Sequence, residues 1–140
     1  MPRVSAWFVR TALGYLVVGF SLGAWLLAEK GLGSRTALAW ALRPAHLEFL
    51  LIGWLVQLVM GVALWIFPRF GVPRSAYGSA GLAWSAFVLL NAGVLLVSVA
   101  PLLPAGAPLA ALGRAIEIAA AAAFAVNLWG RVRPSGLSDI

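Results

Sequence analysis

Four apolar stretches, each long enough to cross a lipid bilayer, constrain this chain more than any other feature of its sequence. A helix needs about 20 mostly apolar residues to span the hydrocarbon core of a membrane. Because lipid offers no hydrogen-bond partners, the backbone of each stretch must pair within itself, which requires an α-helix. The sequence therefore predicts an all-α, polytopic membrane four-helix bundle, a single transmembrane domain over residues 1–140 with helices near residues 6–28, 45–67, 77–100 and 107–129.

The few charged residues agree with this fold class and predict its topology. Only 10% of the residues are charged, whereas soluble domains have about 25%. The net charge of +6 comes mainly from arginines at helix ends and in loops. These arginines form no basic stripe, so we expect no nucleic-acid partner. Lys and Arg are more frequent on the side of the two termini than on the other side, which predicts cytoplasmic termini and, for a bacterial chain, the inner membrane.

Small and turn-forming residues suggest how the first two helices meet. Gly19 and Gly23 have the GxxxG spacing that lets two membrane helices approach closely. We favour packing within one bundle over homodimerisation as their role. In the loop of residues 30–43, Ser34 could cap a short interfacial helix. Pro44 suits the first turn of the second helix, where a missing N–H costs nothing.

A candidate polar site lies near the outer face, because four polar side chains share a similar depth there. They are Glu48, Asn91, Arg114 and Glu117. Polar groups inside a membrane are costly, so each is a functional candidate. Glu48 could complement the helix dipole in a first turn, or pair with Arg114 or with a partner subunit. Arg114 and Glu117, three residues apart, could form a structural salt bridge; the alternatives are anion binding by Arg114 and proton handling by Glu117.

His46 is the only histidine of the chain. At about 100° per residue it shares a helix face with Gly53 and Gln57, a face expected to point into the bundle or a cofactor pocket. Glu48 lies about 200° away, so the two side chains do not form a pair within the helix. Residue types alone favour an interfacial histidine hydrogen-bonded to a loop carbonyl. The absence of cysteine excludes disulfides, thiolate metal sites and covalently attached haem.

The stretch RPAHLEFLLIGWLVQLVMGVALWIFPRF, residues 43–70, resembles the second transmembrane helix of subunit I of haem-copper oxidases. The nitric oxide reductase and cbb3-like branches are most similar. The two share R-x-x-H at the outer end of the helix, Gly-Trp seven residues after the histidine, a further glycine, and an aromatic-Pro-Arg sequence at the other end. The resemblance implies that His46 is an axial ligand of a haem b iron and that Arg43 neutralises a haem propionate. The family's other histidine ligands are absent, so we expect no oxygen or nitric oxide reduction by this chain alone.

Three functions follow as hypotheses. The first is a haem b protein of a respiratory oxygen or nitric oxide system that acts in electron transfer or in binding a diatomic gas. Its haem would be five-coordinate, shared within a homo-oligomer, or completed by another protein. The second is a cofactor-free accessory or assembly subunit of a larger respiratory membrane complex. The third is quinone binding or small-anion transport by Arg114 and Glu117. Beyond the lipid bilayer, a homo-oligomer or a larger complex is the expected partner, and no residue is assigned as catalytic.

Overall fold

The computed structural model describes residues 1–34, 36–66, 79–129 and 131, and within them it is all-helical. The elements are α1 (Arg3–Gly31), α2 (Ala37–Glu48), the π-helix η1 (Phe49–Val56), α3 (Gln57–Ile66), α4 (Ala80–Val99), the 3₁₀ turn η3 (Ala100–Leu102) and α5 (Gly106–Trp129). Four helical stretches are long and apolar enough to cross a membrane: Arg3–Gly31, Ala37–Ile66, Ala80–Leu102 and Gly106–Trp129. The predicted four-helix membrane fold is confirmed.

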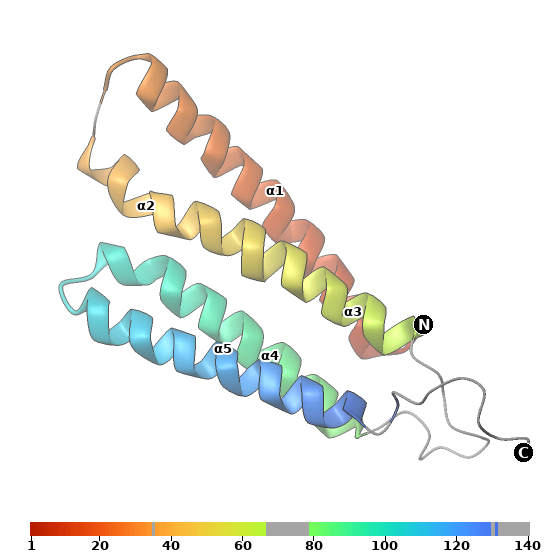
Figure 1. The fold of residues 1–140 in the computed structure, drawn as a ribbon. Helices are drawn as coiled ribbons and strands as arrows, with labels where there is room; N and C mark the ends of the chain where they lie inside the picture. Colours follow the sequence, from red (N-terminus) through yellow and green to blue (C-terminus); the bar gives the residue numbers. More distant parts are fainter. Residues whose placement is uncertain (35, 67–78, 130, 132–140) are drawn as a thin grey trace, which may run out of the picture.

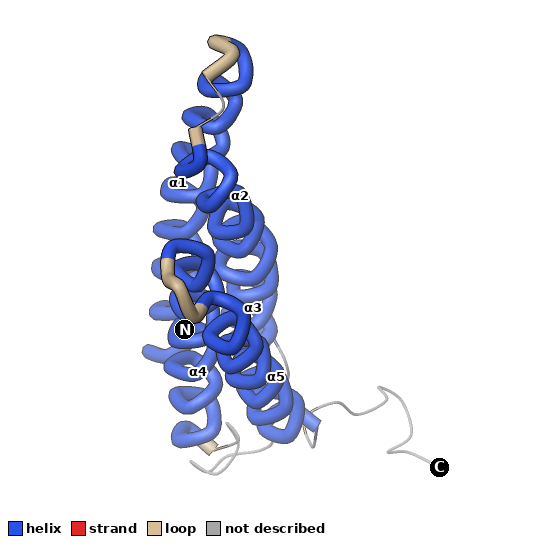
Figure 2. Tube along the Cα trace, turned by 90° about the vertical axis from the view of Figure 1, so that its left-hand side faces the viewer, coloured by secondary structure: helices blue, strands red, loops and turns tan. Residues whose placement is uncertain are grey.

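The bundle consists of two antiparallel hairpins that lie along a common axis (Figures 1 and 2). The first pairs α1 with the continuous helix Ala37–Ile66, and the second pairs α4 with α5. The start of α1, the end of α3, the start of α4 and the end of α5 all lie at one end of the bundle, which we call the termini end (Figure 1). The opposite end is called the far end.

The apolar core is concentrated at the termini end. It includes Phe8 of α1, Met60 of α3, Leu90 of α4 and Ala120 of α5, all at most 5% exposed. The ring of Phe8 also packs edge-on against Phe87, with the ring centroids 5.2 Å apart. Dispersion contacts and close packing of this kind hold membrane helices together, because the hydrophobic effect contributes little to helix association inside lipid.

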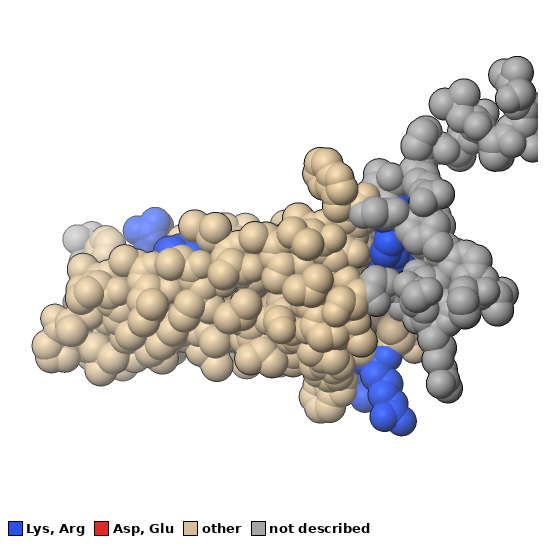
Figure 3. Space-filling view, turned by 90° about the horizontal axis from the view of Figure 1, so that it is seen from below, with Lys and Arg blue, Asp and Glu red and all other residues tan. Residues whose placement is uncertain are grey.

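The outward surface is apolar, as expected for helices in lipid. Val17, Phe20, Ile118 and Val126 are 60–70% exposed. Basic side chains stand towards the two ends of the molecule on the face that Figure 3 shows, with an uncharged belt between them. A belt of this kind is the surface that a hydrocarbon core covers. These features identify the chain as a membrane protein.

The second span differs most from its prediction, because its helix begins at Ala37 rather than at residue 45. Thr36 is the N-cap, and its Oγ1 accepts a hydrogen bond from the Ala39 N–H at 3.3 Å. The predicted cap Ser34 instead donates to the Glu29 carbonyl at 3.3 Å. The stretch expected to form a separate interfacial helix is therefore continuous with the second span from Ala37 onwards, and Pro44 lies inside the helix rather than in its first turn. A membrane helix tolerates such a proline when neighbouring groups adjust.

The other spans lie near their predicted positions. Helix α1 extends three residues beyond the predicted 6–28 at each end, and α5 begins one residue before the predicted 107–129. Helix α4 begins at Ala80, where the Ser79 hydroxyl accepts from the Leu82 N–H at 3.3 Å. Residue 67 of the predicted second span and residues 77–78 of the predicted third span lie outside the described residues.

The π-helix η1 lies in the middle of the second span, directly after Glu48. Its hydrogen bonds run from residue i to residue i+5, so each turn is wider than an α-helical turn. Segments of this kind are often found beside functional sites. Here η1 links the stretch that carries His46 and Glu48 to the tightly packed termini end.

Candidate functional site

His46 lies on α2 and turns its imidazole towards α1. The ring is half-buried, and Nδ1 lies 2.8 Å from the Gly19 carbonyl oxygen. Because a carbonyl only accepts, Nδ1 carries the proton and donates it to this bond. In the neutral ring Nε2 then keeps its lone pair. Nε2 makes no hydrogen bond with any residue that the structure describes.

Two glycines of α1 allow close contact with this part of the second span: Gly23 lies against the imidazole ring, and Gly19 lies against Leu50. A Cβ atom added to Gly23 would lie 2.5 Å from His46 Cε1, and one added to Gly19 would lie 2.7 Å from Leu50 Cδ2. Both distances are too short for a side chain unless the neighbouring side chain or the helix shifts. The GxxxG spacing therefore brings α1 onto the Ala37–Ile66 helix, which confirms packing within the bundle as its role.

The helix face predicted for His46 does point into the bundle. Gly53 lies against the Tyr15 ring, where an added Cβ would be 2.7 Å from the ring carbon Cγ. Gln57 is fully buried, and its Nε2 donates to the Phe8 carbonyl at 3.3 Å. This face packs directly on α1.

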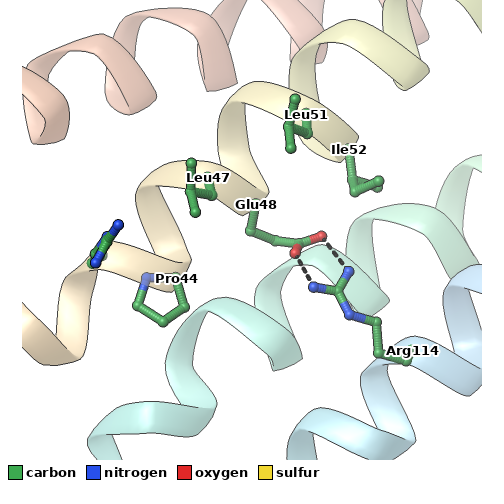
Figure 4. A pocket seen from close by; sticks show the side chains of 7 residues that line it. Pro44, Leu47, Glu48, Leu51, Ile52 and Arg114 are labelled. Carbon is green, nitrogen blue, oxygen red and sulfur yellow. Dashed lines mark hydrogen bonds and ion pairs between the residues drawn. The ribbon is translucent and has the colours of Figure 1, made fainter.

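Glu48 turns to the opposite face and joins the two hairpins. Its carboxylate accepts two hydrogen bonds from the Arg114 guanidinium of α5, with Nη2–Oε2 at 2.6 Å and Nη1–Oε1 at 3.1 Å (Figure 4). The Glu48 side chain is 3% exposed and that of Arg114 is 51% exposed. Glu48 ends α2 and is its twelfth residue, so the alternative that it serves the helix dipole in a first turn is wrong. The predicted pairing with Arg114 is confirmed.

Glu117 completes a carboxylate–guanidinium–carboxylate cluster, which we call the triad: Glu48, Arg114 and Glu117. Arg114 Nη1 lies 2.8 Å from Glu117 Oε2, which confirms the predicted salt bridge along α5. Glu117 is 8% exposed. Its other oxygen, Oε1, is buried and has no hydrogen-bond partner among the described residues.

Close contact between α4 and α5 positions Glu117. A Cβ added to Gly93 of α4 would lie 2.5 Å from Glu117 Cγ, and one added to Gly113 of α5 would lie 2.7 Å from Val97 Cγ2. Sequence reasoning missed these two glycines. A glycine in the interior of each span is the signal that could have found them. Such a glycine lowers helix stability, and this cost is offset where the missing side chain lets two helices pack closely.

A pocket of about 450 Å³ opens beside the triad. Leu47, Leu51, Ile52 and Pro44 give it an apolar wall, and Glu48 and Arg114 form its polar part (Figure 4). Arg43, which is exposed, also lines it. The Arg43 guanidinium carbon lies 6.0 Å from the centroid of the Trp40 ring, at the limit of a cation–π contact.

The structure thus brings together only part of the predicted site. Glu48, Arg114 and Glu117 meet, and Arg43 lines the same pocket. His46 faces α1 instead, and Asn91 donates through Nδ2 to the Phe87 carbonyl of its own helix at 2.8 Å. Within the described part of the chain, no group of three or more His, Cys, Asp or Glu residues is placed to hold a metal ion.

No protein-family model, curated protein or solved structure matches this chain. Its function must therefore be argued from the side chains described above.

Proposed function

We propose that this protein binds haem b through His46 Nε2 and serves a respiratory oxygen or nitric oxide system. We further propose that it lies in a bacterial inner membrane with both termini in the cytoplasm. The hydrogen bond from His46 Nδ1 to the Gly19 carbonyl, at 2.8 Å, is the observation that supports haem binding. Metal-ligating histidines usually donate their second ring N–H to a carbonyl or carboxylate, which fixes the tautomer and presents the other nitrogen to the metal.

The residues present fit one axial ligand. The chain has a single histidine and no cysteine. Met60 is buried and lies 14 residues further along the same helix, about 21 Å away at 1.5 Å per residue. When bound, the haem would supply either one-electron exchange or an iron with a free coordination position, depending on whether a second ligand comes from another chain. Arg43 would have to turn away from its pocket to reach a propionate of this haem.

A second function, a cofactor-free accessory or assembly subunit of a larger respiratory complex, is favoured by a different observation. The close packing of the His46 ring on Gly23 explains the position of this ring without a cofactor. The pocket beside the triad is not lined by His46. Under this proposal the exposed apolar faces of the bundle would contact partner subunits as well as lipid.

The absorption spectrum of the detergent-purified protein, oxidised and dithionite-reduced, tests both functions. Haem binding predicts a Soret band and a positive pyridine haemochrome assay. Both should be lost in His46→Ala and kept in Asn91→Ala, a matched polar truncation on α4. Size-exclusion chromatography would show whether each variant is still folded. A protein that stays colourless when haem is supplied during expression would reject haem binding, and the accessory-subunit proposal then predicts co-purification with larger respiratory proteins.

A further inference from the structure

The triad contains more negative than positive charge. Two carboxylates, Glu48 and Glu117, share the single guanidinium of Arg114. If all three groups were ionised, the triad would hold a net charge of −1. The side chains of Glu48 and Glu117 are only 3% and 9% exposed. An unpaired charge that is buried this deeply in a membrane protein is strongly disfavoured, and a carboxylate in that position takes up a proton instead.

The surroundings offer little to compensate the extra charge. Helix α4, which packs on Glu117 through Gly93, has no ionisable residue along its length, and neither has η1. His46 is on the other face of its helix and turned towards α1. Arg43 lines the pocket but is exposed, and it forms no ion pair with the residues that the structure describes. The triad therefore has to neutralise itself.

We propose that the triad is a proton-binding site that holds one proton at neutral pH. Glu48 uses both carboxylate oxygens to accept hydrogen bonds from Arg114, so each of its oxygens has a partner. Glu117 uses only Oε2, and Oε1 is buried without a partner. Leaving a neutral O–H in that place costs far less than leaving an anionic oxygen there. Two carboxylates that share one site commonly divide their roles in this way.

The pocket gives this proton a way to exchange. The Arg114 side chain is half exposed and forms part of the pocket wall next to Glu48. Water in this pocket would contact the guanidinium that bridges the two acids. Proton uptake and release would change the charge of the triad by one unit while the hairpins stay joined through Glu48 and Arg114. This inference does not depend on haem binding.

Infrared spectroscopy of protein labelled with [¹³C-carboxyl]glutamate tests the proposal. The chain has three glutamates, Glu29, Glu48 and Glu117, so the label marks few groups of the protein. At neutral pH we expect one isotope-shifted C=O band of a protonated carboxyl group. It should vanish in Glu117→Gln, and also in Glu48→Gln, because the remaining acid then pairs one to one with Arg114. Glu29→Gln, at the end of α1, is the matched control and should keep the band.

Three results would overturn the proposal. The absence of a labelled protonated band in the unmodified protein at neutral pH would show that both acids are ionised. A band that persists in Glu48→Gln would show that Glu117 holds its proton regardless of the second carboxylate. A band that disappears in Glu29→Gln would place the proton outside the triad. Since the first result is obtained without any substitution, a variant that fails to fold still leaves the proposal tested.

Discussion

Glu48 and Arg114 connect the two helical hairpins at the half of the bundle away from the apolar cluster around Phe8. The ion pair has two hydrogen bonds, of 2.6 and 3.1 Å, and it joins the end of α2 to the first half of α5. The large apolar side chains that fill the core lie at the other end of the bundle. An ion pair between two spans is strengthened by its low-dielectric surroundings, and breaking it leaves a buried charge without a partner.

Arg114→Met should therefore destabilise the fold by about 2–3 kcal/mol, less than the roughly 3–5 kcal/mol typical of fully buried pairs because Arg114 is half exposed. The free energy of unfolding can be measured by SDS titration in mixed micelles. Arg43→Met is the matched control. It removes a guanidinium from the same pocket that forms no ion pair in the described part of the chain, and it should change stability by no more than about 0.5 kcal/mol. Equal losses in the two variants would contradict the structural role of the ion pair.

The sequence was sufficient for the parts of this fold that depend on local pattern. The length of each apolar stretch located the four spans, and helical periodicity placed Gly53 and Gln57 on the face that packs on α1. The start of the second span was missed because the stretch before Pro44 was expected to form a separate interfacial helix, whereas it continues into the span from its cap Thr36. That error also assigned Glu48 to a first turn. A choice between neighbouring caps depends on how the loop is anchored, and here the Thr36 hydroxyl donates to Glu29 Oε2 at 3.0 Å.

Contacts between spans were only partly predictable. The spacing of Arg114 and Glu117 predicted their salt bridge, since residues three apart share one side of a helix. The pairing of Arg114 with Glu48 remained one of several alternatives until the rotation and depth of both helices were known. The close contact at Gly93 was not predicted, because a glycine signals a helix crossing only once its partner helix is identified.

Gly23→Ala should weaken the packing between α1 and α2. The added methyl group would lie 2.5 Å from His46 Cε1, so the ring or the helix must shift, at a cost of about 1–3 kcal/mol. Gly14→Ala is a matched control on the same helix, because its added methyl group meets nothing within 4 Å. Alanine favours helix over glycine by up to about 1 kcal/mol, so this control should be neutral or stabilising. Thermal unfolding in detergent compares the two.

The combination Gly23→Ala with His46→Ala identifies the cause of the Gly23 effect. With the imidazole removed, the methyl group at position 23 has space, and the cost of Gly23→Ala should fall to about 0.5 kcal/mol or less. If Gly23→Ala lowers stability equally with and without His46, the His46 ring does not pack against Gly23.

Gln57→Leu should leave stability unchanged or raise it by about 1 kcal/mol. Gln57 is fully buried and donates one long hydrogen bond of 3.3 Å, while its Oε1 has no partner among the described residues. Leucine has a similar volume and removes the unsatisfied oxygen together with the weak bond. Gln57→Ala, which leaves a cavity instead, should destabilise by about 2 kcal/mol or more. The free energies of unfolding of both variants, measured by SDS titration, separate the polar effect from the packing effect.

Labelling of single cysteines should show that the far end of the bundle faces away from the cytoplasm. Helix α1 has 29 residues, which at 1.5 Å per residue is about 43 Å, longer than the roughly 30 Å hydrocarbon core, so both of its ends leave the lipid. The chain has no cysteine, and this gives an unlabelled background. A membrane-impermeant maleimide should react with Ser34→Cys in intact cells and with Pro2→Cys only after the membrane is opened. The reverse pattern would place the termini outside and His46 near the cytoplasmic surface, contrary to the proposed topology.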